Sequence, residues 1–193
     1  MKRSLTCFAV LSMVAVLGCV PSLQSFFTES DVTFDKGLVG KWKQDNGQST
    51  WEFSRHAKNG KRKYKLVVEM KEQKQMKRAE FDATLFRLKG QLYLDLFPAG
   101  KPFKENVSGF FGLHVLPAHT LAKIERSEGS LRISMMNPEW ARKRLESHPD
   151  EVNHTKIKDR VVLTASTNDL QAFVDKHKDT PDAFLKPVDL KKD

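Results

Sequence analysis

Cysteine is almost absent from this chain of 193 residues. Only Cys7 and Cys19 occur, and both lie close to the N-terminus. A chain that is cut between them keeps one thiol, so the mature protein can form no intrachain disulfide, even in an oxidising compartment. Because there is no Cys-x-x-Cys pair, the sequence also lacks the usual motif of thiol–disulfide exchange. The fold must therefore be held together by a hydrophobic core.

Long apolar runs are also scarce. One run extends from Leu5 to Leu17 and follows the cations Lys2 and Arg3. A positive start, a short apolar middle and a small-residue exit are the parts of a secretory signal peptide. The run is shorter than the ~20 residues that a membrane-spanning helix needs. Residues 1–18 are therefore predicted to be a signal peptide that is removed.

The signal ends in Val16, Leu17, Gly18 and Cys19, which together resemble a lipobox, the sequence that bacterial lipoprotein-processing enzymes read. The resemblance implies that the Cys19 thiol receives a diacylglyceryl group, that the chain is cleaved before this residue, and that fatty acyl chains such as palmitate anchor it. The expected location is the cell envelope, at the outer membrane or facing the periplasm. The alternative is an ordinary signal peptide with an incidental cysteine.

The mature chain has a length that suits one domain with a sizeable core. Residues 19–36 are rich in Ser, Thr, Asp and Gln and show little periodicity, which predicts a lipidated tether. Residues 37–193 are predicted to form the folded domain, a β-barrel with a C-terminal helix.

From residue 37 onward, apolar residues alternate with polar ones, which is the pattern of strands with one buried face. The pairs Asn59-Gly60, Lys89-Gly90 and Glu128-Gly129 lie between such runs and favour tight hairpin turns. Eight strands are predicted, near residues 38–42, 51–53, 64–70, 79–85, 92–97, 121–124, 131–135 and 161–163. A last short strand is possible at residues 183–185.

Two short helices are predicted to interrupt the strands. Asn137-Pro138 provides a cap followed by proline in the first helical turn, and Ser166 or Thr167 caps the second helix. The predicted fold class is mainly β, an antiparallel up-and-down eight-stranded barrel with two short helices, because full closure removes the sheet edges. A barrel of this size is filled by side chains or holds one small ligand.

The run Gly40-Lys41-Trp42 in the first strand resembles the Gly-x-Trp motif of lipocalins and related calycins. The resemblance implies a calycin-like barrel in which the Trp closes one end and a basic residue late in the barrel packs against it. Arg160 is the nearest candidate for that basic residue. The chain departs from the family pattern because the helix at 138–147 lies between two strands. The chain also resembles exported bacterial lipoproteins, which implies no activity.

Positive charge is concentrated in one segment. The formal charge of the chain is +9, and residues 55–78 hold ten Lys or Arg and two Glu. In a meander this segment forms a basic stripe along the barrel wall, which could bind anionic lipid headgroups or an acidic envelope polymer. The alternative is a solvated strand face that prevents aggregation. Nucleic acid is not an expected partner, because no aromatic residues interleave with the charges. The stripe is represented by Lys58, Lys61, Arg62, Lys63 and Lys65.

Catalytic and metal-binding motifs are absent, so no catalytic residue, metal or cofactor is predicted. His114 and His119 are the nearest approach to a metal pair, but on a regular strand they would point to opposite faces. A hydrolase would require one of these histidines to converge with Asp95, which is expected on the outer face of the barrel.

Three hypotheses of function follow from this architecture. The first is an anchored barrel that binds a small apolar or amphipathic molecule, with the loop at residues 98–112 closing over its mouth. The second is an interaction or scaffold protein of the envelope that binds a protein or an anionic polymer through the basic stripe. The third is the hydrolase. The residues expected to line or close the ligand site are Trp42, Trp51, Phe53, Leu66, Val68, Phe110 and Phe111.

Overall fold

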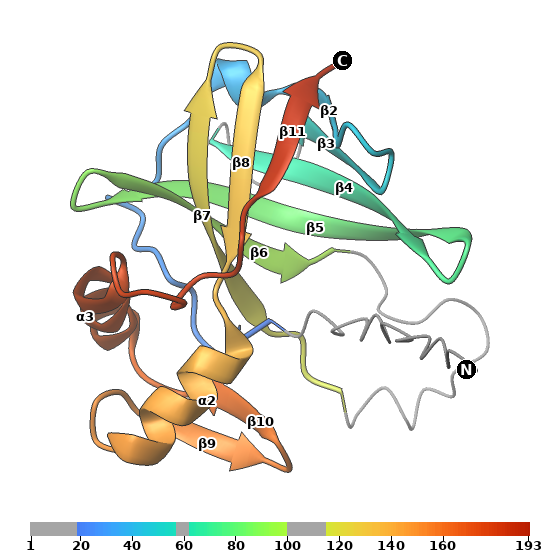
Figure 1. The fold of residues 1–193 in the computed structure, drawn as a ribbon. Helices are drawn as coiled ribbons and strands as arrows, with labels where there is room; N and C mark the ends of the chain where they lie inside the picture. Colours follow the sequence, from blue (N-terminus) through green and yellow to red (C-terminus); the bar gives the residue numbers. More distant parts are fainter. Residues whose placement is uncertain (1–18, 57–61, 100–114) are drawn as a thin grey trace, which may run out of the picture.

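The computed structural model describes residues 19–56, 62–99 and 115–193 (Figure 1). The strands are β1 (Pro21–Ser22), β2 (Gly40–Lys43), β3 (Ser49–Arg55), β4 (Lys63–Glu72), β5 (Gln75–Leu88), β6 (Gln91–Pro98), β7 (His119–Ser127), β8 (Ser130–Met135), β9 (His154–Ile157), β10 (Arg160–Leu163) and β11 (Val188–Lys192). The helices are the 3-10 helix η1 (Lys36–Leu38) and the α-helices α2 (Pro138–Ser147) and α3 (Thr167–His177).

Eight of these strands close into an antiparallel barrel in the order β2, β3, β4, β5, β6, β7, β8 and β11. The closing contact pairs Lys192 of β11 with Trp42 of β2. On its other side β11 pairs with β8, where Leu190 lies opposite Leu131. The predicted mainly β fold, with an eight-stranded antiparallel barrel and two short helices, is confirmed.

The identity of the eighth strand was predicted wrongly. Residues 160–163 form β10, which lies outside the barrel and pairs with β1 and β9. The barrel is closed instead by the C-terminal strand β11. Residues 160–163 hold three apolar residues in a row and β11 holds two at a spacing of two, and such short patterns predict a strand but not its pairing partner. The predicted strand at residues 183–185 is reduced to a single bridge between Met136 and Phe184.

The two ends of the barrel differ in what covers them. One end carries η1 and the turns at residues 89–90 and 128–129, and it is called the helix-capped end here. The other carries the turns at residues 44–48 and 73–74 and the insertion between β8 and β11, residues 136–187, and it is called the insertion end. Figure 1 shows α2, β9 and β10 of the insertion below the barrel and α3 beside it.

Local signals fix the two α-helices where they were predicted. The Asn137 side chain accepts hydrogen bonds from the backbone N–H groups of Glu139 and Trp140, and Pro138 begins α2. Ser166 caps α3 by accepting from the N–H of Asp169. The β5–β6 turn has positive φ at Lys89 and Gly90, as the tight-turn signal predicted.

Residues 20–36 are not a loose tether. Val20, Phe26 and Val32 are buried, and the chain binds the barrel wall through backbone hydrogen bonds from Thr33 to Leu85 and from Arg87 to Asp31. The physical reason is that β5 extends past the start of β4, which leaves one side of residues 85–87 free for residues 31–33. The composition of the segment did not predict this attachment to the barrel wall, because only a few apolar residues anchor the segment.

Two apolar clusters form the core. The first fills the barrel interior, and the second lies between the outer wall of the barrel, the N-terminal segment, α2 and α3. Phe86 and Tyr93 on the outer wall belong to the second cluster, as do Leu170 and Phe173 of α3. No helix in the described ranges is long and apolar enough to cross a membrane.

Candidate functional site

The residues predicted to line a ligand site come together in the barrel interior. Trp42, Trp51, Phe53, Leu66 and Val68 all belong to the interior cluster, and each is at most 6% exposed. They pack on one another, so the part of the interior that they occupy is filled by side chains. Phe110 and Phe111, with most of the predicted loop over the mouth, lie outside the described residues.

Trp42 is held firmly by its surroundings. Its indole Nε1 donates to the carbonyl oxygen of Leu38 at 2.8 Å, which ties β2 to η1 at the helix-capped end. The Lys192 ammonium lies 5.3 Å from the centre of the indole ring and donates to the carbonyl oxygen of Gly37 at 3.0 Å. Gly40 has a φ of 128°, and a Cβ there would lie 3.1 Å from the Lys192 side chain.

The basic residue against Trp42 is therefore Lys192 and not Arg160. Arg160 is exposed on β10, outside the barrel. A sequence signal for Lys192 did exist, because Val188, Leu190 and Lys192 keep the period of two that a barrel strand requires.

Trp51 differs from Trp42 in one respect. The residue is 6% exposed, and within the described chain its Nε1 has no hydrogen-bond acceptor. Buried polar groups in native proteins are almost always satisfied, so a water or a ligand oxygen could bond to this donor. The hydroxyl of Tyr93, in the outer cluster, also has no partner among the described residues. The side chains that are only half-buried against the interior cluster at the insertion end are Met70, Phe81, Met135 and Val188.

A second polar group lies on the outer wall of the barrel. His119 Nδ1 is 2.7 Å from Asp95 Oδ1, and the other carboxylate oxygen accepts from the backbone N–H of Phe26 at 2.9 Å. The N-terminal segment covers Asp95, whose side chain is 2% exposed. The imidazole also lies against the ring of Phe97, with the ring centres 4.6 Å apart.

This pair meets one requirement of the hydrolase hypothesis, because the histidine and the carboxylate converge. A nucleophilic mechanism needs a hydroxyl or thiol within hydrogen-bond reach of Nε2, the other ring nitrogen of His119. Within the described residues, no such group is bonded to that nitrogen. Because Asp95 also accepts from the Phe26 N–H, the Asp95–His119 pair contributes to the attachment of the N-terminal segment.

Replacing Asp95 with Asn should loosen that attachment. The substitution keeps the volume but removes the charge that serves both the His119 ring and the Phe26 N–H, so we expect a loss of about 3 kcal/mol in the free energy of unfolding. Urea unfolding measures this. Asp82→Asn is the matched control, because Asp82 also pairs with a histidine, at 3.0 Å from His56, but is 33% exposed. A loss no larger than that of the control would contradict the assignment.

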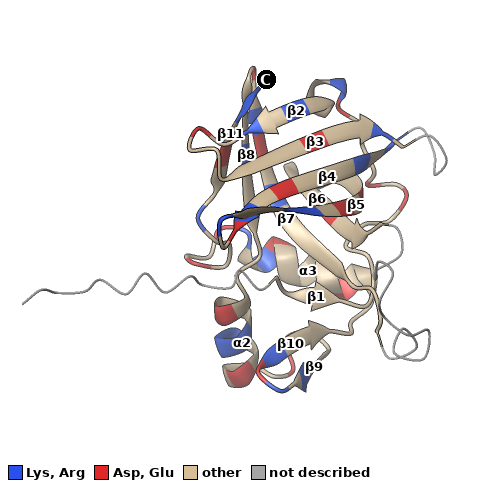
Figure 2. Ribbon diagram, turned by 90° about the vertical axis from the view of Figure 1, so that its right-hand side faces the viewer, with Lys and Arg blue, Asp and Glu red and all other residues tan. Residues whose placement is uncertain are grey.

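Each of the three described residues of the basic stripe has a partner, but of these three residues only Lys65 contacts a carboxylate. Lys65 and Arg78 share the carboxylate of Glu80, at 2.9 and 2.8 Å, and these contacts lower the pKa of Glu80. Arg62 donates to the carbonyl oxygen of Val32, and Lys63 lies over the ring of Phe27. Figure 2 shows acidic positions beside basic ones on β3, β4 and β5. Lys58 and Lys61 lie outside the described residues.

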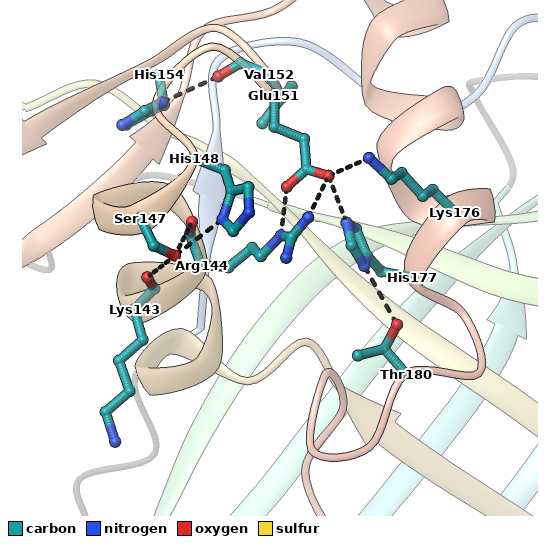
Figure 3. Close-up of polar contacts among 10 residues, drawn as sticks. All are labelled: Lys143, Arg144, Ser147, His148, Glu151, Val152, His154, Lys176, His177 and Thr180. Carbon is teal, nitrogen blue, oxygen red and sulfur yellow. Dashed lines mark hydrogen bonds and ion pairs between the residues drawn. The ribbon is translucent and has the colours of Figure 1, made fainter.

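A buried carboxylate that the sequence did not reveal joins the two helices of the insertion (Figure 3). Glu151 accepts two hydrogen bonds from Arg144 of α2, at 2.6 and 2.9 Å, and contacts Lys176 and His177 of α3. Hydrogen bonds from the Arg144 guanidinium, and also from Lys176 and His177, hold the pKa of Glu151 well below its usual range. The four contacts of Glu151 involve residues distant in the sequence, so no local motif predicted this cluster.

No group of three or more potential metal ligands occurs among the described residues. Taken together, the geometry defines a calycin-like closed barrel with an apolar interior and one unsatisfied indole within it. Comparison of the chain with protein-family models, curated proteins and solved structures finds no match in any of the three.

Proposed function

We propose that this protein is a lipid-anchored protein of the bacterial cell envelope whose barrel holds one small amphipathic molecule. The observation that carries the proposal is the Trp51 indole, a buried donor without an acceptor inside a closed eight-stranded barrel. Barrels of this size have room for one small ligand at most. Lipid anchoring is proposed from the lipobox that ends at Cys19.

The chemistry of the ligand follows from the residues around Trp51. An acceptor oxygen on the ligand would satisfy the indole N–H, whose burial without a partner costs about 1–3 kcal/mol. Trp42 supplies the contrast, because its own N–H is already bonded to Leu38. The adjoining part of the interior is already occupied by Trp42, Phe53 and Leu66, which are at most 1% exposed. The apolar part of the ligand would therefore extend toward the half-buried side chains at the insertion end.

The surroundings of Cys19 support the anchor. Cys19 is an unpaired cysteine, and its burial raises the pKa of the thiol, which disfavours the reactive thiolate. A free thiol in an oxidising compartment is a liability that acylation removes. The buried Val20 follows directly, so the lipid would be attached at the surface of the folded domain.

The ligand is tested by binding and by extraction. Trp51→Phe should weaken the binding of a dansyl-labelled undecanoic acid about tenfold, since one hydrogen bond contributes about 1–1.5 kcal/mol. Trp140→Phe is the control, because Trp140 packs on Phe173 outside the barrel. Organic extraction of natively purified protein, followed by mass spectrometry, should release a stoichiometric amphipathic molecule. Equal affinity in all three proteins, with nothing extracted, would refute the proposal.

A further inference from the structure

We propose that the insertion end of the barrel rests on the membrane surface that holds the lipid anchor. The contact would be made by the β4–β5 turn, by Leu23 and by residues 115–118, with anionic phospholipid headgroups as the partner. This inference rests on the acylation of Cys19 in the proposed function but not on the ligand.

The first argument is the short length of chain between the lipidated residue and the folded domain. Pro21 and Ser22 of β1 pair with Thr120 and His119 at the start of β7. Cys19 is two residues from this contact, a reach of about 7 Å. The first residues of β7 lie at the insertion end, because β7 runs from there toward the turn at 128–129. Acyl chains on Cys19 would thus leave the protein beside the insertion end.

The second argument is the distribution of exposed apolar side chains. Four large ones are exposed within the described ranges, and none of them lies at the helix-capped end. Met76 is beside the β4–β5 turn, Leu23 follows β1, Leu116 precedes β7, and Ile157 belongs to the insertion. Their exposed fractions range from 45% for Leu23 to 76% for Leu116. The exposed large apolar side chains of the described residues therefore all lie away from the helix-capped end.

The third argument is charge. Lys71, Lys74 and Lys77 surround the β4–β5 turn, are exposed, and have no ion-pair partner in the described part of the chain. Glu72 is the one carboxylate within residues 71–77. Farther along the same hairpin, Lys65 and Arg78 both contact the carboxylate of Glu80. Each lysine near an anionic membrane contributes about a fivefold gain in binding.

Figure 1 shows that these features lie on the same side of the molecule. The β4–β5 turn, the yellow segment at residues 115–118 and the β9–β10 turn all project toward the lower right of the view, away from η1 and the β7–β8 turn. A flat membrane on that side would meet all three.

The orientation is tested on the lipidated full-length protein, processed in a bacterial host and incorporated into vesicles of phosphatidylethanolamine and phosphatidylglycerol. Because Cys19 is acylated, a cysteine introduced by Met76→Cys is the sole site for an environment-sensitive fluorophore. Brominated lipids should quench this label strongly and leave a label at Lys89→Cys, at the helix-capped end, unaffected. Quenching at Lys89→Cys but not at Met76→Cys, or equal quenching at both, would overturn the orientation.

A charge-reversal variant tests the same surface without the anchor. The Cys19→Ala chain that also carries Lys71→Glu, Lys74→Glu and Lys77→Glu should bind phosphatidylglycerol vesicles at least a hundredfold more weakly than Cys19→Ala alone. Lys36→Glu with Lys89→Glu, at the other end, should change binding less than threefold. Equal losses in the two variants would overturn the inference. The anchor fails separately if Cys19→Ala retains lipid labelling and membrane fractionation.

Discussion

Deleting residues 188–193 is expected to prevent the barrel from folding. The deletion removes β11, which is hydrogen-bonded to β2 on one side and to β8 on the other. Both neighbours would become open edges, and the interior around Trp42 would lose the cover of Leu190 and Lys192. The loss is comparable with the whole stability of a domain, about 5–15 kcal/mol. Circular dichroism and size-exclusion chromatography should show an unfolded or aggregated chain.

A point variant makes this test quantitative. Leu190→Ala should reduce the free energy of unfolding by about 3 kcal/mol, because Leu190 is 1% exposed inside the barrel. Asp189→Ala on the same strand is the control and should stay within about 0.5 kcal/mol of the parent, since its side chain is 73% exposed. A folded, monomeric deletion protein, or similar losses in the two point variants, would contradict closure of the barrel by β11.

Glu151→Gln should destabilise the insertion by about 3 kcal/mol at pH 7. The carboxylate is 7% exposed and contacts Arg144, Lys176 and His177, so removing its charge leaves two cationic groups and an imidazole without their shared partner. The matched control is Glu139→Gln, which also removes a carboxylate paired with an arginine of α2, Arg142, but on the exposed face of the helix. Its unfolding midpoint should not shift measurably, because exposed ion pairs contribute little.

The same variant has a predictable pH dependence. The folded-state pKa of Glu151 is lowered, so its contribution is fully present above the unfolded value of about 4.3 and is lost as pH falls through the folded value. The difference in stability between the parent and Glu151→Gln should therefore be constant from pH 7 to about 5 and should narrow steadily toward pH 3. A difference that grows as the solution becomes more acidic would show that Glu151 is not ionised in the native cluster.

The sequence predicted the parts of the fold that local patterns encode. Alternation located β4 and β6, Lys89-Gly90 marked a hairpin, and Asn137-Pro138 marked the start of α2. These signals depend only on residues close together in the sequence, so they can be recognised without knowing how the strands pair.

Features that depend on distant contacts were not predictable in the same way. The choice of β11 over β10 as the closing strand depends on which edge each one meets. Residues 31–33 are ordered by a free side of β5 that no local pattern reveals. The Glu151 cluster joins side chains 7 to 26 positions away. The unsatisfied Trp51 donor is likewise a property of packing, although Trp51 itself was predicted as a ligand contact.

The most direct test of the proposed ligand site is the indole N–H spectrum of the protein labelled with nitrogen-15. Three tryptophans give three signals, which Trp→Phe variants at 42, 51 and 140 assign. Adding an amphipathic ligand extracted from the native protein, or a dansyl-labelled fatty acid, should move the Trp51 signal downfield as its N–H gains an acceptor. The Trp42 signal, already bonded to Leu38, should hold its position. A Trp51 signal that stays fixed at saturating ligand would contradict the account.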